Sequence, residues 1–215
     1  MIKMINNFNN VRHDLHGRFG HACDARVIDA IVDDVIADHS ASATVTDFLP
    51  VFVARDAAER IGEHLKSHGA TSSPRKRILF ASRGNGSRAK LAAALARQLT
   101  DEGVLATAAA THPENASDSK LVAIREERGL PTVAVTGRAG TGRVLDAPDV
   151  VVYMDDSESH DLPGLRQVQW DVPNPSGMSM DQVRDLADDI ELRVVALLDT
   201  LGVPVTARAE ALLPV

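Results

Sequence analysis

The residues best suited to chemistry form a short loop that reads Ser82-Arg-Gly-Asn-Gly-Ser-Arg88. Its two glycines and its asparagine tolerate positive backbone φ angles, which allow successive N–H groups to point into one concavity and bind an anion. A predicted helix follows the loop, so the positive end of the helix dipole points at the same place. Arg88 adds a planar guanidinium group that suits a tetrahedral oxyanion. We therefore expect oxyanion binding through the residues Arg83, Gly84, Asn85, Gly86, Ser87 and Arg88.

A strand before the loop and a helix after it must hold this site. The segment 77–81 is short and apolar, as in a buried strand, and residues 89–99 have the apolar spacing of a helix. The same alternation continues along the chain. Further strands are predicted at residues 104–110, 131–136 and 149–154, and further helices at residues 117–128 and 179–201. Strands that alternate with helices predict an α/β fold with a four-stranded parallel sheet flanked by helices.

The N-terminal part of the chain follows a different pattern. In residues 24–38 and 46–65, apolar side chains recur at intervals of three and four, which predicts amphipathic helices, and the segment 11–19 supplies a shorter first helix. A polar stretch with a proline follows and opposes helix continuation. We therefore predict two domains, a small three-helix bundle of residues 1–73 and the α/β domain of residues 74–215.

Composition argues against several classes of function. The formal net charge of -7 and the pI near 5.6 argue against broad electrostatic binding to nucleic acid, because that mode needs a basic surface. No run approaches the roughly 20 apolar residues that cross a bilayer, and the start of the chain lacks the apolar core of a signal peptide. We expect a cytoplasmic protein that binds neither nucleic acid nor membranes.

Cysteine usage narrows the chemistry further. Cys23 is the only cysteine, which excludes an internal disulfide, a two-thiol redox pair and a multi-cysteine zinc site. The histidines near Cys23 fit a polar helix end better than a metal site, and the acidic segment 155–161 fits a solvated loop. We expect neither a metal nor a cofactor.

Several separated motifs resemble the low-molecular-weight protein tyrosine phosphatases and the related thioredoxin-coupled arsenate reductases. The loop is similar to their Cys-x5-Arg phosphate loop. This resemblance places Ser82 at the nucleophilic cysteine, Asn85 at a structural asparagine and Arg88 at the phosphate-binding arginine. It implies the family's α/β fold and a phosphate site at this loop.

The resemblance extends over nearly the whole chain. Residues 147–154 are similar to the strand that precedes the resolving-cysteine segment of arsenate reductases. Pro163-Gly164 and Trp170-Asp-Val-Pro-Asn-Pro-Ser-Gly177 resemble the family's Pro-Gly and Trp-Asp-x-Pro-Asp-Pro-x-Gly stretches. The N-terminal helices, with Asp47-Phe-Leu-Pro50, resemble a helical extension of some actinobacterial arsenate reductases.

The reactive half of the family's site is absent from this sequence. In the family the cysteine thiolate attacks phosphorus or arsenic, whereas the Ser82 hydroxyl is barely ionised near neutral pH and needs a neighbouring base. Asn174 stands at the general-acid aspartate, and its amide cannot donate a proton to a leaving group. The segment 155–161 has no thiol where arsenate reductases place redox cysteines, and Ala89 replaces a hydroxyl residue. An engineered Cys-to-Ser change would account for only one of these four departures.

Two functions remain open. The first is a protein that binds a phosphate-like oxyanion, a phosphorylated ligand or a partner in a regulatory role, and whose helical bundle could mediate a homodimer. The second is an enzyme with altered chemistry, either a serine-dependent phosphatase or a transferase. In the second case Ser82 would react, and groups near the loop end of the sheet would act as acid or base. The candidates for that task are Asp155, Asp156, His160, Asp171 and His112.

Overall fold

The computed structural model describes residues 2–42, 49–70, 74–84, 86–111, 118–133, 135–136, 147–155 and 162–206. Contacts divide the described residues into two compact units, one up to Arg75 and the other from Lys76 onward. Each unit has its own hydrophobic core. Our division into two domains between residues 73 and 74 remains a prediction about independent folding.

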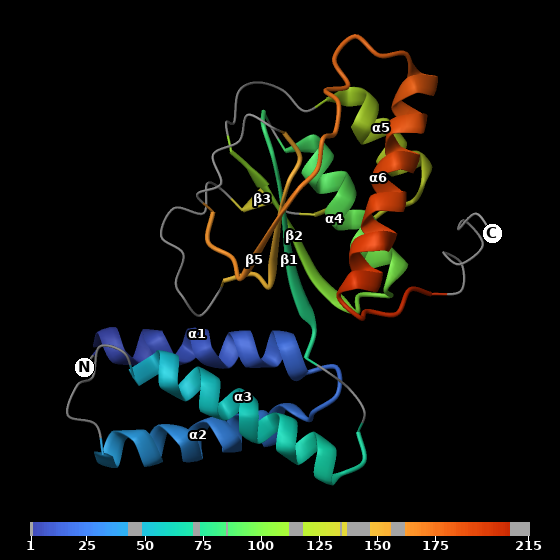
Figure 1. Ribbon diagram of the computed structural model, residues 1–215. Coiled ribbons are helices and arrows are strands. Elements are labelled where there is room, and N and C mark those ends of the chain that lie inside the picture. Colours follow the sequence, from blue (N-terminus) through green and yellow to red (C-terminus); the bar gives the residue numbers. More distant parts are fainter. Residues whose placement is uncertain are drawn as a thin grey trace. The chain divides into compact units, whose positions relative to one another are not determined.

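Within the described residues up to Arg75, three helices pack as a bundle (Figure 1). They are α1 (Ile2–Phe19), α2 (Ala25–Ser42) and α3 (Leu49–Ser67), and each contacts the other two. The core residues recur every three or four positions, as predicted: Val11, Leu15 and Phe19; Ile28, Val32 and Val35; Val53, Ala57, Ile61 and Leu65. The three predicted helices are confirmed. Helix α1 begins earlier than predicted, at Ile2, and Phe8 adds an apolar contact to the core before Val11.

Polar side chains join the helices of this bundle at its surface. On α1, Arg12 pairs with Asp29 of α2, and His16 Nε2 lies 2.9 Å from Asp29 Oδ1. Between α2 and α3, His39 Nε2 lies 2.8 Å from Asp56 Oδ2. The hydrogen bond with His16 is the main cause of a lowered pKa at Asp29, and the hydrogen bond with His39 is the main cause at Asp56. These pairs therefore stabilise the bundle while the two aspartates are ionised.

The second unit contains a parallel sheet (Figure 1). Among the described residues its strands are β1 (Lys76–Ser82), β2 (Val104–Ala110), β3 (Val135–Thr136), β4 (Val150–Tyr153) and β5 (Arg166–Gln169). They lie in the order β3-β2-β1-β4-β5, and every neighbouring pair is parallel. The four strands predicted from the sequence are confirmed, with β3 shorter than predicted.

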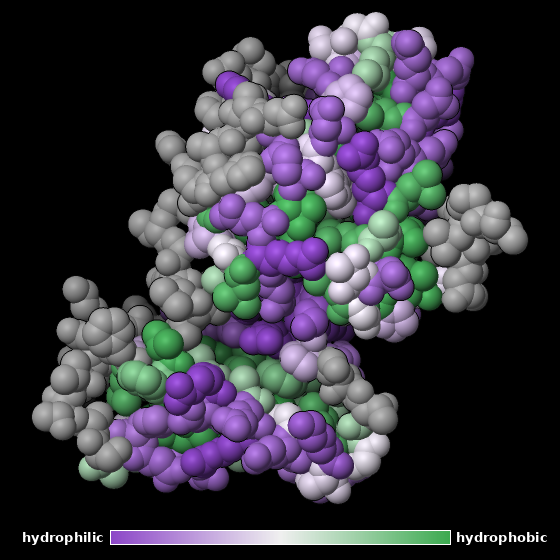
Figure 2. Space-filling view, in the orientation of Figure 1, coloured by the Kyte–Doolittle hydropathy of each residue, from purple (hydrophilic) through white to green (hydrophobic). Residues whose placement is uncertain are grey.

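Helices α4 (Ser87–Leu99), α5 (Ser119–Glu127) and α6 (Met180–Thr200) flank this sheet. They share one large core with side chains such as Phe80 and Val152, while the opposite sheet face has a smaller core around Tyr153. Hydrophilic residues dominate the visible side of α6, as expected of an amphipathic helix (Figure 2). None of the described helices combines the length and the apolar character that a membrane span needs.

Strand β5 is an addition to the predicted sheet. Arg166, Gln167 and Gln169 are exposed, and only Val168 is partly buried. The strand pairs with β4 and forms the edge of the sheet, so backbone hydrogen bonds define it more than apolar burial does. Its sequence therefore lacks the alternation from which a half-buried strand is predicted.

Candidate oxyanion-binding site

The carboxyl ends of β1, β4 and β5 meet at one edge of the sheet. The Met154 amide donates to the Ala81 carbonyl oxygen at 3.0 Å, and the Trp170 amide donates to the Tyr153 carbonyl oxygen at 2.7 Å. Parallel strands end at the same edge, so the loops that follow them become neighbours. The described loop residues after β1 therefore lie beside Asp155 and close to the residues that follow Trp170.

Two glycines give the loop its path from β1 into α4. Gly84 has a φ of 67° and Gly86 has a φ of 73°, in the left-handed region that glycine adopts at little cost. A Cβ atom at Gly86 would lie 3.4 Å from the Ala109 carbonyl oxygen, an ordinary van der Waals contact, so the positive φ is what favours glycine here. Gly86 is the N-cap of α4 and offers no side chain to cap the helix. Asn85 lies outside the described residues.

Ser82 is the last residue of β1, and its side chain lies against the first turn of α4. Its side chain is fully buried, and its Oγ accepts a hydrogen bond from the Ala89 amide at 3.4 Å. Within the described part of the chain, no carboxylate or imidazole hydrogen-bonds to this hydroxyl. The candidate partners His112, Asp156 and His160 lie outside the described residues.

Arg88 is held by the segments that follow two other strands. Only 5% of its side chain is exposed, so its charge needs nearby partners. Its Nη2 donates to Asp155 Oδ1 at 2.6 Å, and its Nη1 donates to the Val172 carbonyl oxygen at 2.5 Å. The guanidinium therefore connects the start of α4 to the residues after β4 and β5.

Asp155 contacts the loop as well as the guanidinium. Its Oδ2 accepts a hydrogen bond from the Arg83 amide at 2.9 Å, while its Oδ1 accepts from Arg88. The carboxylate thus contacts two groups that we predicted to bind an oxyanion. The sequence suggested Asp155 only as a candidate acid or base. The sequence places Asp155 directly after a buried strand. It does not show that this strand lies next to β1, and this contact could be predicted only with the order of the strands.

The other candidate residues lie around this centre. Ser87 Oγ accepts a hydrogen bond from the Asp118 amide at 3.2 Å, which ties the start of α4 to the start of α5. Asp171 is exposed. Asn174 is also exposed, and its Oδ1 accepts from the Ser176 amide at 3.0 Å. These last two residues flank Val172, the partner of Arg88, so they share a segment with the site.

A family model described as "Low molecular weight phosphotyrosine protein phosphatase" matches residues 77–206. The chain belongs to this family. The match begins in β1 and includes the loop, Arg88 and Asp155, together with every strand and helix of the second unit. The helical bundle lies outside it.

Arsenate reductases are among the similar proteins. A protein of Halobacterium salinarum named "Putative arsenate reductase" is 33% identical over 90 residues, which cover 41% of this chain and 63% of that relative. The match therefore spans less than two thirds of the relative's length. A solved arsenate reductase in the phosphate binding state covers 58% of this chain and 98% of its own, at 18% identity and a TM-score of 0.50, a likeness of fold.

One solved structure covers more of this chain. The Corynebacterium glutamicum thioredoxin-dependent arsenate reductase covers 92% of this chain and 97% of its own, at 19% identity and a TM-score of 0.46.

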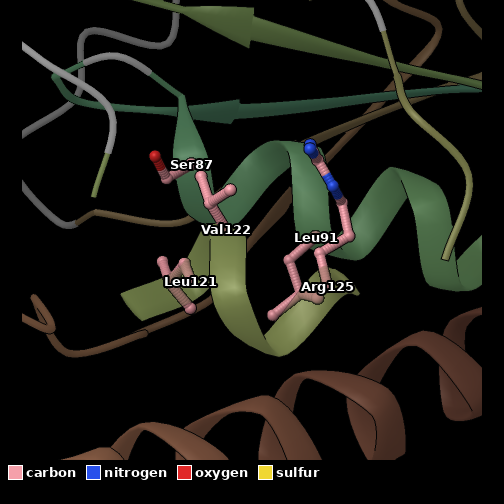
Figure 3. A pocket seen from close by; sticks show the side chains of 5 residues that line it. All are labelled: Ser87, Leu91, Leu121, Val122 and Arg125. Atoms are coloured by element: carbon pink, nitrogen blue, oxygen red, sulfur yellow. The ribbon is translucent and has the colours of Figure 1, made fainter. Parts of the chain in front are cut away.

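A small hollow in the phosphatase-family unit shares Ser87 with the predicted oxyanion-binding residues. It lies between α4 and α5 and is lined by Ser87, Leu91, Leu121, Val122 and Arg125 (Figure 3). Most of these side chains are apolar, and Ser82, Arg88 and Asp155 are not among them. Apart from Ser87, the hollow therefore lacks the residues that we assign to the oxyanion site.

Proposed function

We propose that this phosphatase-family protein binds a tetrahedral oxyanion, free or as a phosphoryl group, and that it works without thiol chemistry in a regulatory role. The observation that carries this proposal is the buried Arg88 guanidinium beside the glycine loop at the start of α4. A buried cation, a helix start without a side-chain cap and two left-handed glycines form the usual surroundings of a bound phosphate.

The absence of thiol chemistry follows from the residues present. The only cysteine, Cys23, belongs to the core of the helical bundle, and Ser82 stands where the family's loop has its cysteine. A serine hydroxyl stays protonated near neutral pH and is a weak nucleophile without a base. Asn174, at the position of the family's acid, uses its side-chain oxygen in a turn and has no proton of suitable acidity to give.

Phosphate titration of an arginine variant tests the proposal. Arg88→Lys keeps the positive charge but loses the planar fork, so we expect the Kd for inorganic phosphate to rise about tenfold or more, measured by calorimetry. Arg97→Lys is the matched control, because Arg97 lies on the same helix and pairs with Glu102 near the surface. Equal affinities of the wild type and Arg88→Lys would remove Arg88 from the site and with it the basis of the proposal.

A serine-dependent enzyme has less support. Asp155, the described carboxylate at the centre of the site, contacts Arg83 and Arg88 rather than Ser82. Asp171 is exposed. Hydrolysis of a phosphomonoester that disappears in Ser82→Ala would nevertheless favour this alternative over the binding role.

A further inference from the structure

The Asp155 carboxylate accepts hydrogen bonds from groups that would bind an oxyanion in the proposed function. Its two oxygens accept from the Arg83 amide at 2.9 Å and from Arg88 Nη2 at 2.6 Å. Two oxygens of one phosphate group would approach a loop amide and a guanidinium in the same way. The carboxylate therefore resembles the ligand in charge sign, in geometry and in the groups that it contacts.

We propose that Asp155 is an internal ligand of the oxyanion site, which an external oxyanion must displace in order to bind. This inference rests on the proposed function. The physical reason is competition, because the Arg83 amide and Arg88 Nη2 each donate to one oxygen of Asp155. A second anion on the same donors would also lie beside the carboxylate, and two negative charges at such a distance repel each other.

Displacement makes the site selective. An incoming anion loses the benefit of two existing charge-assisted hydrogen bonds unless it replaces them with more or better ones. A tetrahedral oxyanion with several oxygens can contact the guanidinium and further loop amides together, whereas chloride cannot. Binding also separates Asp155 from the loop, so the end of β4 responds to occupancy. Such a response is what a regulatory protein without catalysis needs.

The first test removes the charge of the internal ligand. Asp155→Asn keeps a side-chain oxygen of similar shape, so we expect its Kd for inorganic phosphate to fall about tenfold or more below that of the wild type. Asp199→Asn makes the same chemical change at an exposed position on α6 and is expected to leave the Kd unchanged. Phosphate binding by Asp155→Asn alone, with none by the wild type, would support Asp155 as the internal ligand but would contradict the proposed binding of free phosphate by the wild type.

Two other results distinguish a failure of this inference from a failure of the proposed oxyanion binding. If the wild type binds phosphate and Asp155→Asn binds it no more tightly, the internal-ligand role is wrong and the proposed function stands. If neither protein binds phosphate, the proposed function fails and the inference fails with it.

A second measurement uses the wild type and does not depend on the folding of a variant. In a phosphate titration followed by nuclear magnetic resonance, both the Arg83 amide and the Asp155 side-chain carboxyl carbon should shift with the same midpoint. Shifts of the loop amides without any shift at the Asp155 carboxyl would mean that phosphate binds beside the carboxylate, which overturns displacement while it leaves oxyanion binding intact.

Discussion

At the scale of single residues, Ser82 decides what chemistry this loop can perform. Its hydroxyl is buried against the start of α4 and accepts a hydrogen bond from the Ala89 amide. The loop glycines, Arg88 and the helix dipole would stabilise an anion at that position, but serine does not supply one near neutral pH. The environment and the residue are therefore mismatched for nucleophilic attack, although they remain suited to binding.

The substitution Ser82→Cys tests this mismatch. We expect the new thiol to have a pKa below the ordinary value of about 8.5, because the helix dipole and Arg88 favour the thiolate. Thiolate absorbance in the ultraviolet, followed against pH, measures the shift. The native Cys23 gives little background, because burial and the charge of Asp24 raise the pKa of its thiol.

Ser67→Cys is a suitable control for that titration. Ser67 is exposed at the last residue of α3, where the negative end of the helix dipole lies. If the thiols introduced by Ser82→Cys and Ser67→Cys ionise at the same pH, the loop does not concentrate positive potential at Ser82, and the proposed anion site loses its electrostatic basis.

At the scale of elements, much of this fold could be predicted because most segments bury a regular apolar face. Helix α6 and strand β2 follow their patterns closely. Strand β5 does not, because only Val168 contributes burial and its other residues are exposed. The contacts of Arg88 could not be predicted from the sequence pattern either, because 67 residues separate it from Asp155 and 84 from Val172. Those pairs meet only because β4 and β5 follow β1 across the sheet, which periodicity cannot reveal.

Gly164 shows another constraint of this kind. It precedes β5, and a Cβ atom there would lie 2.4 Å from Val151 Cγ2 in the middle of β4. Gly164→Ala should therefore lower the free energy of unfolding of this unit by about 1–3 kcal/mol, the usual cost of overpacking. Trp170 fluorescence during urea denaturation is the measurement, because the only tryptophan of the chain packs against Phe80 in the large core of the same unit.

Gly62→Ala provides the comparison for Gly164. A Cβ atom at Gly62 in α3 would meet nothing within 4 Å, and alanine favours a helix over glycine. The Trp170 transition of Gly62→Ala should match that of the wild type. A Gly164→Ala transition that also matched the wild type would show that β4 and the residues before β5 pack less closely than these distances indicate.

At the scale of the whole molecule, the chain combines a phosphatase-family unit with a helical bundle that the family match does not include. Both units have an apolar core, but they place their charged pairs differently. The sheet unit buries Arg88 with Asp155, while the bundle places its histidine and aspartate pairs near the surface. The expected role of the bundle in a homodimer stays a prediction. Trp170 fluorescence follows the sheet unit, which holds the only tryptophan, whereas a helical circular dichroism signal comes from both units because α4, α5 and α6 belong to the sheet unit.

The bundle should lose stability in acid as Asp29 and Asp56 become protonated. In the folded state the pKa values of Asp29 and Asp56 lie below the ordinary value of 3.8, mainly through hydrogen bonds with His16 and His39. A lowered folded pKa contributes stability that is fully present above 3.8 and is lost as the pH falls through the folded value. We expect the part of the helical circular dichroism transition that does not coincide with the Trp170 fluorescence transition to move to lower urea over this acid range.

The double variant Asp29→Asn and Asp56→Asn identifies the source of that loss. It should be less stable than the wild type at neutral pH, because both histidine pairs lose their charge-assisted hydrogen bonds, and its urea midpoint should depend less on pH below 3.8. Asp34→Asn, an exposed change on α2, should keep the wild-type dependence. An acid response of the double variant equal to that of the wild type would assign the loss to other carboxylates, and the His16 and His39 pairs would then contribute little to holding the three helices together.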